Sequence, residues 1–206
     1  MDDFPVAPLL PGAVLARRQA LPLKPAPVWL EGRTVRLAPL DPACDTPALF
    51  ALTNGQAARL GSRAVDAYDA DALIWRYMNS GPYPDAETMA ENLAEWCAGA
   101  DVLCLCVFDQ ASGLPVGSAS YMSNHPAHLK IELGSIWYSP LAQGTAANSE
   151  ATYLMLRHVF ELGYRRVEWK CNALDARSRR AALRLGFQFE GIQEAHAIVK
   201  GRSRDT

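Results

Sequence analysis

The chain has 206 residues, half of them hydrophobic, and a formal net charge of −2 at pH 7. A chain of this size can bury one good core and is expected to form one domain. The weak negative charge excludes a general attraction to nucleic acid or to an anionic membrane. No apolar run approaches the roughly 20 residues that span a bilayer, and the start Met1-Asp2-Asp3 is the opposite of a cationic signal peptide. We therefore expect a cytoplasmic location.

The cysteines and histidines show no metal-binding spacing. The five cysteines are odd in number and include no Cys-x-x-Cys pair. Cys104 and Cys106 lie two residues apart in an expected strand, so they share a face and do not easily bond to each other. These features predict reduced thiols, as in a cytosolic protein, and no metal site.

The first half of the chain predicts helices after a proline-rich arm. Residues 1–27 hold six of the 14 prolines and are expected to form an extended or partly disordered arm before a single domain over 28–206. Beyond the arm, the patterns predict a strand over Arg33–Leu40 and helices over Asp41–Gly55, Asp66–Asn79 and Asp85–Ala98.

The second half predicts mainly strands. The patterns indicate strands over Val102–Phe108, Pro115–Met122 and Ile131–Tyr138, a helix from Ala147 to Leu162 ended by Gly163, a strand over Arg166–Lys170, a helix over Ala176–Leu185 and a last strand region over Phe187–Val199. This order predicts an α/β fold in three layers with a mixed central sheet.

The segment from Ile131 to Gly163 carries the only strand–loop–helix pattern of the sequence that is typical of a phosphate-binding site. A strand ends at Pro140, a loop of small and polar residues follows, and a helix begins. Such a loop presents free backbone N–H groups and the positive end of a helix dipole to an anion. We expect a pyrophosphate there, and the alternative is an ordinary strand-to-helix turn. Glu150 would repel the phosphate, so its side chain should point away.

Several residues together resemble the GNAT family of acetyl-coenzyme A-dependent N-acetyltransferases. Gln143, Ala146 and Asn148 stand at the main positions of the family's Gln/Arg-x-x-Gly-x-Gly/Ala loop. The run Asp175 to Ser178, with the later Arg184-Leu185-Gly186-Phe187 and Glu190-Gly191, is similar to a second family segment. The resemblance is strongest to the branch of Rim-type ribosomal-protein N-terminal acetyltransferases and covers roughly Leu30 to Thr206.

The resemblance implies a mostly antiparallel sheet that splays in the middle, and three positions depart from the family pattern. Ala146 replaces a loop glycine, so its backbone must adopt angles that an L-residue tolerates. Asp175 replaces the usual asparagine. The family's last strand is apparently missing after Arg204-Asp205-Thr206, which would leave a strand edge open.

The resemblance also implies where acetyl-coenzyme A would bind. The cofactor would lie between the Ile131–Tyr138 and Arg166–Cys171 strands, with its pantetheine arm paired to the backbone near Ile136 and Tyr138. The expected contacts to its phosphates are the loop residues Gln143, Gly144, Thr145, Ala146, Ala147, Asn148 and Ser149, together with Arg180. A solvated basic face is the alternative for Arg180 and its neighbours Arg177 and Arg184.

The expected chemistry needs a base, because only a neutral amine attacks a thioester. By resemblance, Glu132 is the candidate base; alternatively it is a solvated or salt-bridged strand carboxylate. A backbone N–H of the splayed strand would stabilise the developing oxyanion. Many relatives carry a tyrosine acid where this chain has Ala182, so the candidates for the acid here are Ser178, Asp175 and water. Asp175 is equally well explained as a helix cap.

The acceptor is the least determined part. Trp75, Tyr77 and Tyr83 lie where relatives shape the acceptor cleft, although an aromatic stripe is more often core. We expect a protein N-terminus or a small-molecule amine as acceptor, no nucleic-acid or membrane partner, and a homodimer as one possible assembly. The main hypothesis is acetyl transfer by direct attack in a ternary complex. The alternative is a non-catalytic sensor that binds acyl-coenzyme A.

Overall fold

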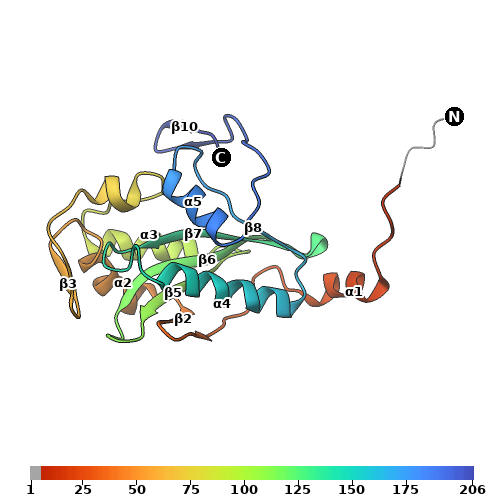
Figure 1. Cartoon of the computed structure of the whole chain (residues 1–206), viewed down its shortest axis with the longest axis horizontal. Helices are drawn as coiled ribbons and strands as arrows, with labels where there is room; N and C mark the ends of the chain where they lie inside the picture. Colours follow the sequence, from red (N-terminus) through yellow and green to blue (C-terminus); the bar gives the residue numbers. More distant parts are fainter. Residues whose placement is uncertain (1–5) are drawn as a thin grey trace.

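A six-stranded sheet forms the centre of the computed structural model, which describes residues 6–206. The strand order is β1 (Leu30–Glu31), β2 (Val35–Pro39), β5 (Leu103–Asp109), β6 (Pro115–His125), β7 (Lys130–Tyr138) and β8 (Arg166–Glu168). Every neighbouring pair is antiparallel except β7 with β8, which is parallel. Figure 1 shows β8 at the upper edge of the sheet and β2 near the lower one.

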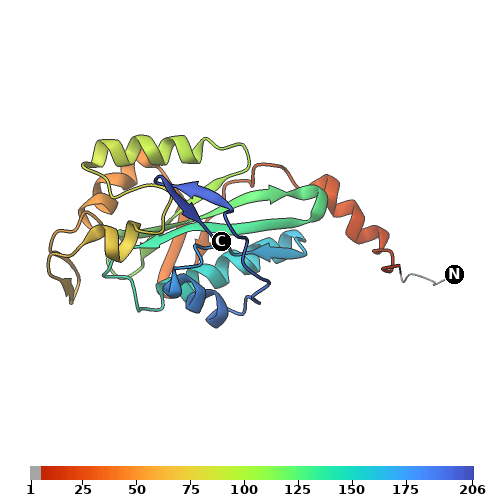
Figure 2. The ribbon, with the colours of Figure 1, turned by 90° about the horizontal axis from the view of Figure 1, so that it is seen from above.

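Helices cover both faces of this sheet. In Figure 2, α3 (Ala86–Cys97) lies on one side and α4 (Ala147–Leu162) on the other. Strand β5 shows the cause: Leu105 and Val107 belong to the core below α4, whereas Cys104 and Cys106 belong to the core with α2 (Pro42–Ala51) and α3. Because successive side chains of a strand point to opposite faces, β5 presents an apolar surface to both helical layers. The predicted three-layer mixed α/β fold is confirmed.

The N-terminal arm differs from the prediction of an extended segment. Residues Gly12–Ala20 form the helix α1, which begins after Pro11 and contains no proline. Figure 1 shows α1 projecting from the body. The arm is also attached, because the side-chain amide of Asn124 donates hydrogen bonds to the carbonyl oxygens of Pro22 and Leu23. The first five residues of the expected arm lie outside the described part.

The prediction of a helix over Asp66–Asn79 is largely wrong. Only Asp71–Trp75 is helical, as the single π-helical turn η1, and a small hairpin of β3 (Ala58–Leu60) and β4 (Arg63–Val65) precedes it. The aromatic spacing instead reflects packing: Trp75 is 2% exposed and its ring lies 5.0 Å from that of Trp137. Tertiary contacts, not helical periodicity, therefore determine this segment.

The last strand region also differs from the prediction over Phe187–Val199. The helix α5 (Ala176–Arg184) is followed by a long loop, and then β9 (Ala197–Val199) and β10 (Arg202–Arg204) pair as a separate hairpin. Its turn, Lys200-Gly201, has φ of 50° and 72°, as a two-residue hairpin turn requires. In Figures 1 and 2 the hairpin lies over the sheet edge formed by β7 and β8.

Candidate active site

Strands β7 and β8 separate in the middle of the sheet, as the resemblance implies. They pair only through Lys130–Glu132 of β7 and Arg166–Glu168 of β8. From Leu133 to Tyr138, no described strand pairs with this edge of β7. The open edge is where the pantetheine arm is expected, beside Ile136 and Tyr138, because an extended ligand can add itself to an unpaired strand.

A β-bulge at Ser135 adds to this opening. Trp137 pairs with Ser118 and Gly134 with Ser120, so two residues of β7 oppose one residue of β6. Ser135 takes the left-handed conformation with φ of 49°. A bulge leaves a backbone group outside the regular ladder. This is the kind of strand irregularity that can supply the oxyanion N–H expected above.

The loop after β7 and the start of α4 present unused N–H groups. Within residues 6–206, the backbone N–H groups of Gly144, Ala146, Asn148 and Ser149 form no hydrogen bond with the protein. The N-cap residue Ala146 has no side-chain cap, and its φ of −70° is one that an L-residue adopts without strain. The alanine in place of the family glycine is therefore compatible with the loop. The residues present fit a diphosphate.

Gln143 connects this loop to its surroundings. Its side-chain N–H donates to the carbonyl oxygen of Tyr138 at 3.0 Å, and its Oε1 lies 3.5 Å from Nη1 of Arg177. Arg180 is exposed and forms no hydrogen bond or salt bridge with a described residue. The guanidinium beside the loop is thus that of Arg177, and the role of Arg180 stays a prediction.

Glu150 points away from the loop, as expected. Its carboxylate accepts hydrogen bonds from the backbone N–H groups of Arg33 and Thr34 at 2.7 Å each, and from Val35 at 3.1 Å. Although partial burial opposes ionisation, a hydrogen bond from the Thr34 hydroxyl and these backbone bonds hold the pKa of Glu150 below its ordinary value. The start of α4 is thereby fastened to the turn before β2.

A Glu150→Gln substitution should lower the free energy of unfolding at pH 7 by about 1–3 kcal/mol, because a charged acceptor is lost. Since the pKa is depressed in the folded protein, this stabilisation is present above the unfolded pKa and is lost as the pH falls through the folded value. Thermal unfolding from neutral to acidic pH should therefore show the difference from the parent shrinking. Glu161→Gln, which removes an exposed partner of Arg157 on the same helix, should change stability by less than about 1 kcal/mol.

Glu132 lies beside the place where β7 and β8 separate. Its side chain is 7% exposed, and its Oε2 accepts a hydrogen bond from Nζ of Lys170 at 2.6 Å. Lys170 also contacts Glu168 at 2.9 Å.

Burial alone would lower the pKa of Lys170, but its hydrogen bonds to the two carboxylates raise it. Although burial opposes ionisation, hydrogen bonds from Arg166 and two lysines lower the pKa of Glu168 to about 2. Lys170 is therefore a fixed cation, and Oε1 of Glu132 has no partner among the described residues.

A cavity of about 570 Å³ opens in front of Glu132. Its walls come from β6, β7, the segment after β8 and the β9–β10 hairpin. Its charged or ionisable lining residues are Glu132, Lys170, His196, Lys200 and Arg204. This volume is sufficient for a small organic acceptor.

Ser178 and Asp175 lie at the start of α5. The side chain of Asp175 accepts hydrogen bonds from the N–H groups of Arg177 and Ser178, so it caps the helix. The hydroxyl of Ser178 accepts from the indole N–H of Trp169 at 3.0 Å, which leaves its own hydrogen free to donate. Neither residue lines the cavity in front of Glu132. Their catalytic roles stay predictions.

The three aromatic residues expected to bind the acceptor do not line this cavity. Trp75 is buried, and its indole N–H donates to the carbonyl oxygen of Thr53 at 3.2 Å. The hydroxyl of Tyr83 bonds Ser80 and Asn92 at 2.7 Å each. Tyr77 is half-buried. In this conformation Trp75 shapes the site by packing, since its ring has almost no accessible surface.

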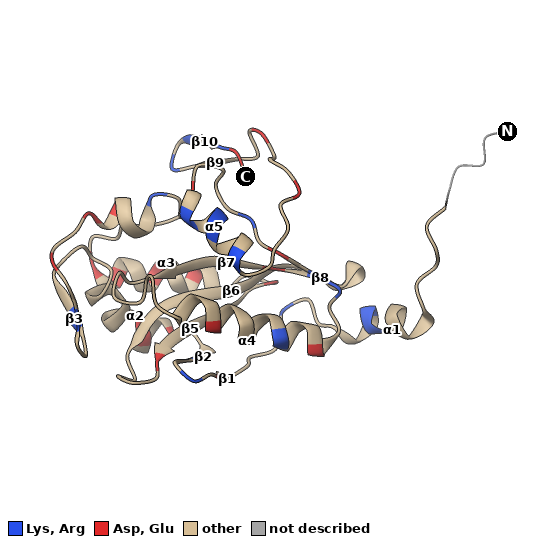
Figure 3. Ribbon diagram, viewed as in Figure 1, with Lys and Arg blue, Asp and Glu red and all other residues tan. Residues whose placement is uncertain are grey.

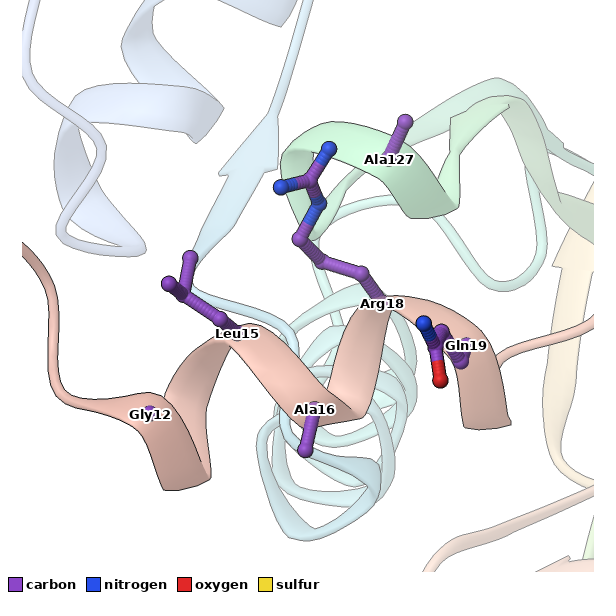
Figure 4. A pocket seen from close by; sticks show the side chains of 6 residues that line it. All are labelled: Gly12, Leu15, Ala16, Arg18, Gln19 and Ala127. Atoms are coloured by element: carbon purple, nitrogen blue, oxygen red, sulfur yellow. The ribbon is translucent and has the colours of Figure 1, made fainter.

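A second hollow, of about 560 Å³, lies along α1, where Arg18 is the one charged residue of the lining (Figure 4). It is far less suited to chemistry, because it contains no candidate base or nucleophile. In the described part of the chain, no group of three His, Cys, Asp or Glu side chains could hold a metal ion. None of the described helices has the length and apolarity to cross a membrane.

Sequence reasoning missed Lys170, Lys200 and Arg204 as site residues. The alternation of side chains along Arg166–Lys170 indicated a charged pair, because Glu168 and Lys170 fall on the same face of that strand. The dipeptide Lys200-Gly201 between alternating residues was also a hairpin signal. The position of the hairpin over Glu132 had no signal in the sequence.

The fold and the site together define an acyltransferase. A family model described as an acetyltransferase (GNAT) domain matches residues 35–188. The chain therefore belongs to the GNAT acetyltransferase family.

Solved structures agree with this assignment. A GCN5-related N-acetyltransferase from Brucella melitensis is 37% identical, with 88% of this chain and 77% of that chain covered and a TM-score of 0.77. A probable acetyltransferase (GNAT family) from Chromobacterium violaceum is 33% identical over 100% of this chain and 93% of that one, with a TM-score of 0.81.

The fold likeness extends to the Rim type. An acetyl transferase from Salmonella typhimurium, which modifies the N-terminal serine of 50S ribosomal subunit protein L7/L12, has a TM-score of 0.69. It is 18% identical, with 86% of this chain and 95% of that chain covered, so the likeness is one of fold. No match is found among the curated proteins.

Proposed function

We propose that this protein transfers an acetyl group from acetyl-coenzyme A to a primary amine, by direct attack while both substrates are bound. The observation that carries the proposal is the buried carboxylate of Glu132. It lies at the splayed edge of β7, with one oxygen held by Lys170 and the other without a partner in residues 6–206. It also lines a cavity large enough for an acceptor.

The acceptor amine must lose a proton before it attacks, since an alkyl ammonium has no lone pair. Oε1 of Glu132 would take that proton, directly or through a water. Lys170 fixes the orientation of the carboxylate by binding Oε2. A backbone N–H near the bulge at Ser135 would stabilise the charge that develops on the thioester oxygen.

The chain's own groups also account for cofactor binding and for release of the thiol. The free N–H groups from Gly144 to Ser149 would hold the diphosphate, and the open edge of β7 would align the pantetheine arm. The hydroxyl of Ser178, which accepts from Trp169, would donate a hydrogen bond to the departing thiolate, and the thiolate would take its proton from solvent. Acetyl-coenzyme A supplies the activated acyl group.

Thiol release measured over a panel of amines and peptide N-termini tests this function. We expect coenzyme A release that depends on both the acceptor and acetyl-coenzyme A. Coenzyme A should also raise the melting temperature in a concentration-dependent way. Saturable coenzyme A binding without acceptor-dependent release would favour the sensor, and absence of binding would remove both functions.

A further inference from the structure

The cavity in front of Glu132 contains two cations that no described carboxylate neutralises. Lys170 is paired with Glu132 and Glu168. Lys200 and Arg204, on the β9–β10 hairpin, form no salt bridge with a residue in 6–206. Asp71 acts on Lys200 only at longer range and is itself paired with Arg76 at 3.2 Å. The cavity therefore has the candidate base Glu132 on one wall, and on another wall it has the positive charges of Lys200 and Arg204 without a paired carboxylate.

Both cations are held by hydrogen bonds that leave other donors free. Nζ of Lys200 donates to the carbonyl oxygen of Trp75 at 2.7 Å. Arg204 donates from Nη1 to Oδ1 of Asn79 at 3.2 Å and from Nε to Oγ1 of Thr206 at 3.1 Å. An ammonium has three donors and a guanidinium five. Burial lowers the pKa of Lys200, an effect that a bound anion would oppose. Figure 3 shows basic residues on the hairpin and on α5 at the same side of the molecule.

We propose that the acceptor is a small primary amine that also carries a carboxylate, with its amine towards Glu132 and its carboxylate between Lys200 and Arg204. This inference rests on the proposed function and specifies its substrate class. Apolar side chains of Met122 and Val199 also line the cavity and would contact the carbon chain between the two groups. A peptide N-terminus lacks an adjacent carboxylate unless an acidic side chain follows, and is therefore a poorer fit.

The test compares matched acceptors in the thiol-release assay at saturating acetyl-coenzyme A. We expect kcat/KM for β-alanine or γ-aminobutyrate to exceed that for propylamine or butylamine by about tenfold or more, as a charge-assisted contact gives. Lys200→Gln and Arg204→Gln should each reduce this preference about tenfold by raising KM for the amino acid, with little effect on the alkylamine. Arg202→Gln, an equal charge change at an exposed position of the same hairpin outside the cavity lining, should keep the preference.

Equal kcat/KM for the amino acids and alkylamines would overturn the inference and leave acetyl transfer intact. An equal loss of preference in the Arg202 variant would overturn it too, since the effect would then be one of net charge. If no acceptor supports release, the proposed function fails, and calorimetry with γ-aminobutyrate decides the anion site separately. Binding that weakens in Lys200→Gln and Arg204→Gln supports the site, and absence of binding rejects it. Unchanged melting temperatures exclude misfolding of the variants.

Discussion

A Glu132→Gln variant should lose about two to three orders of magnitude in kcat/KM for the amine, because a positioned general base contributes on that scale. The substitution conserves shape and removes only the charge and the proton acceptor. Steady-state thiol release across the pH range measures this effect.

The matched control for that experiment is Glu168→Gln. Glu168 also contacts Lys170, at 2.9 Å, but it does not line the cavity. We expect a much smaller loss of kcat/KM in the control, which weakens the contacts of Glu168 with Lys130, Arg166 and Lys170 but keeps the proposed base. If Glu132→Gln retained the parent's turnover at every pH, the carboxylate would have no part in proton transfer. If both variants lost activity equally, the charge network as a whole would be responsible rather than Glu132.

An Asn148→Asp variant should weaken coenzyme A binding by about tenfold to a hundredfold while leaving the fold intact or slightly more stable. The new carboxylate would lie in the first turn of α4, next to the free N–H groups proposed for the diphosphate. Charge repulsion at short range costs on the order of 1–3 kcal/mol, which corresponds to that change in dissociation constant. A negative charge at a helix start nevertheless stabilises the helix.

Calorimetry for coenzyme A and thermal unfolding without ligand separate these two effects. Gln19→Glu, which adds the same charge on the exposed helix α1, controls for net charge. Unaltered coenzyme A affinity in Asn148→Asp would place the diphosphate elsewhere. A lower melting temperature combined with weaker binding would indicate damage to α4 instead of repulsion at the site.

The sequence by itself determined the features that depend on neighbouring residues. The loop from Gln143 to Asn148, the helix α4 and its end at Gly163 follow from small residues, helical periodicity and a glycine with φ of 97°. The direction of Glu150 was also predictable, because a carboxylate avoids a site prepared for phosphate. The resemblance to the GNAT family rested on this loop together with the run from Asp175 to Gly191.

Only the tertiary structure decided which groups meet in the site. The bulge at Ser135 shifts the alternation of β7: Ile131 and Leu133 lie in the α4 core, whereas Trp137 lies in the opposite core. A regular strand would have placed all three on one face, because side chains alternate with a period of two.

The partners of Glu132 likewise come from distant parts of the chain. Lys170 is 38 residues away, and the β9–β10 hairpin reaches the cavity only after a loop that follows α5. Local patterns set the strands and helices, since those depend on backbone preference and periodicity. The charges in the cavity were set by packing between elements, which no short stretch of sequence encodes.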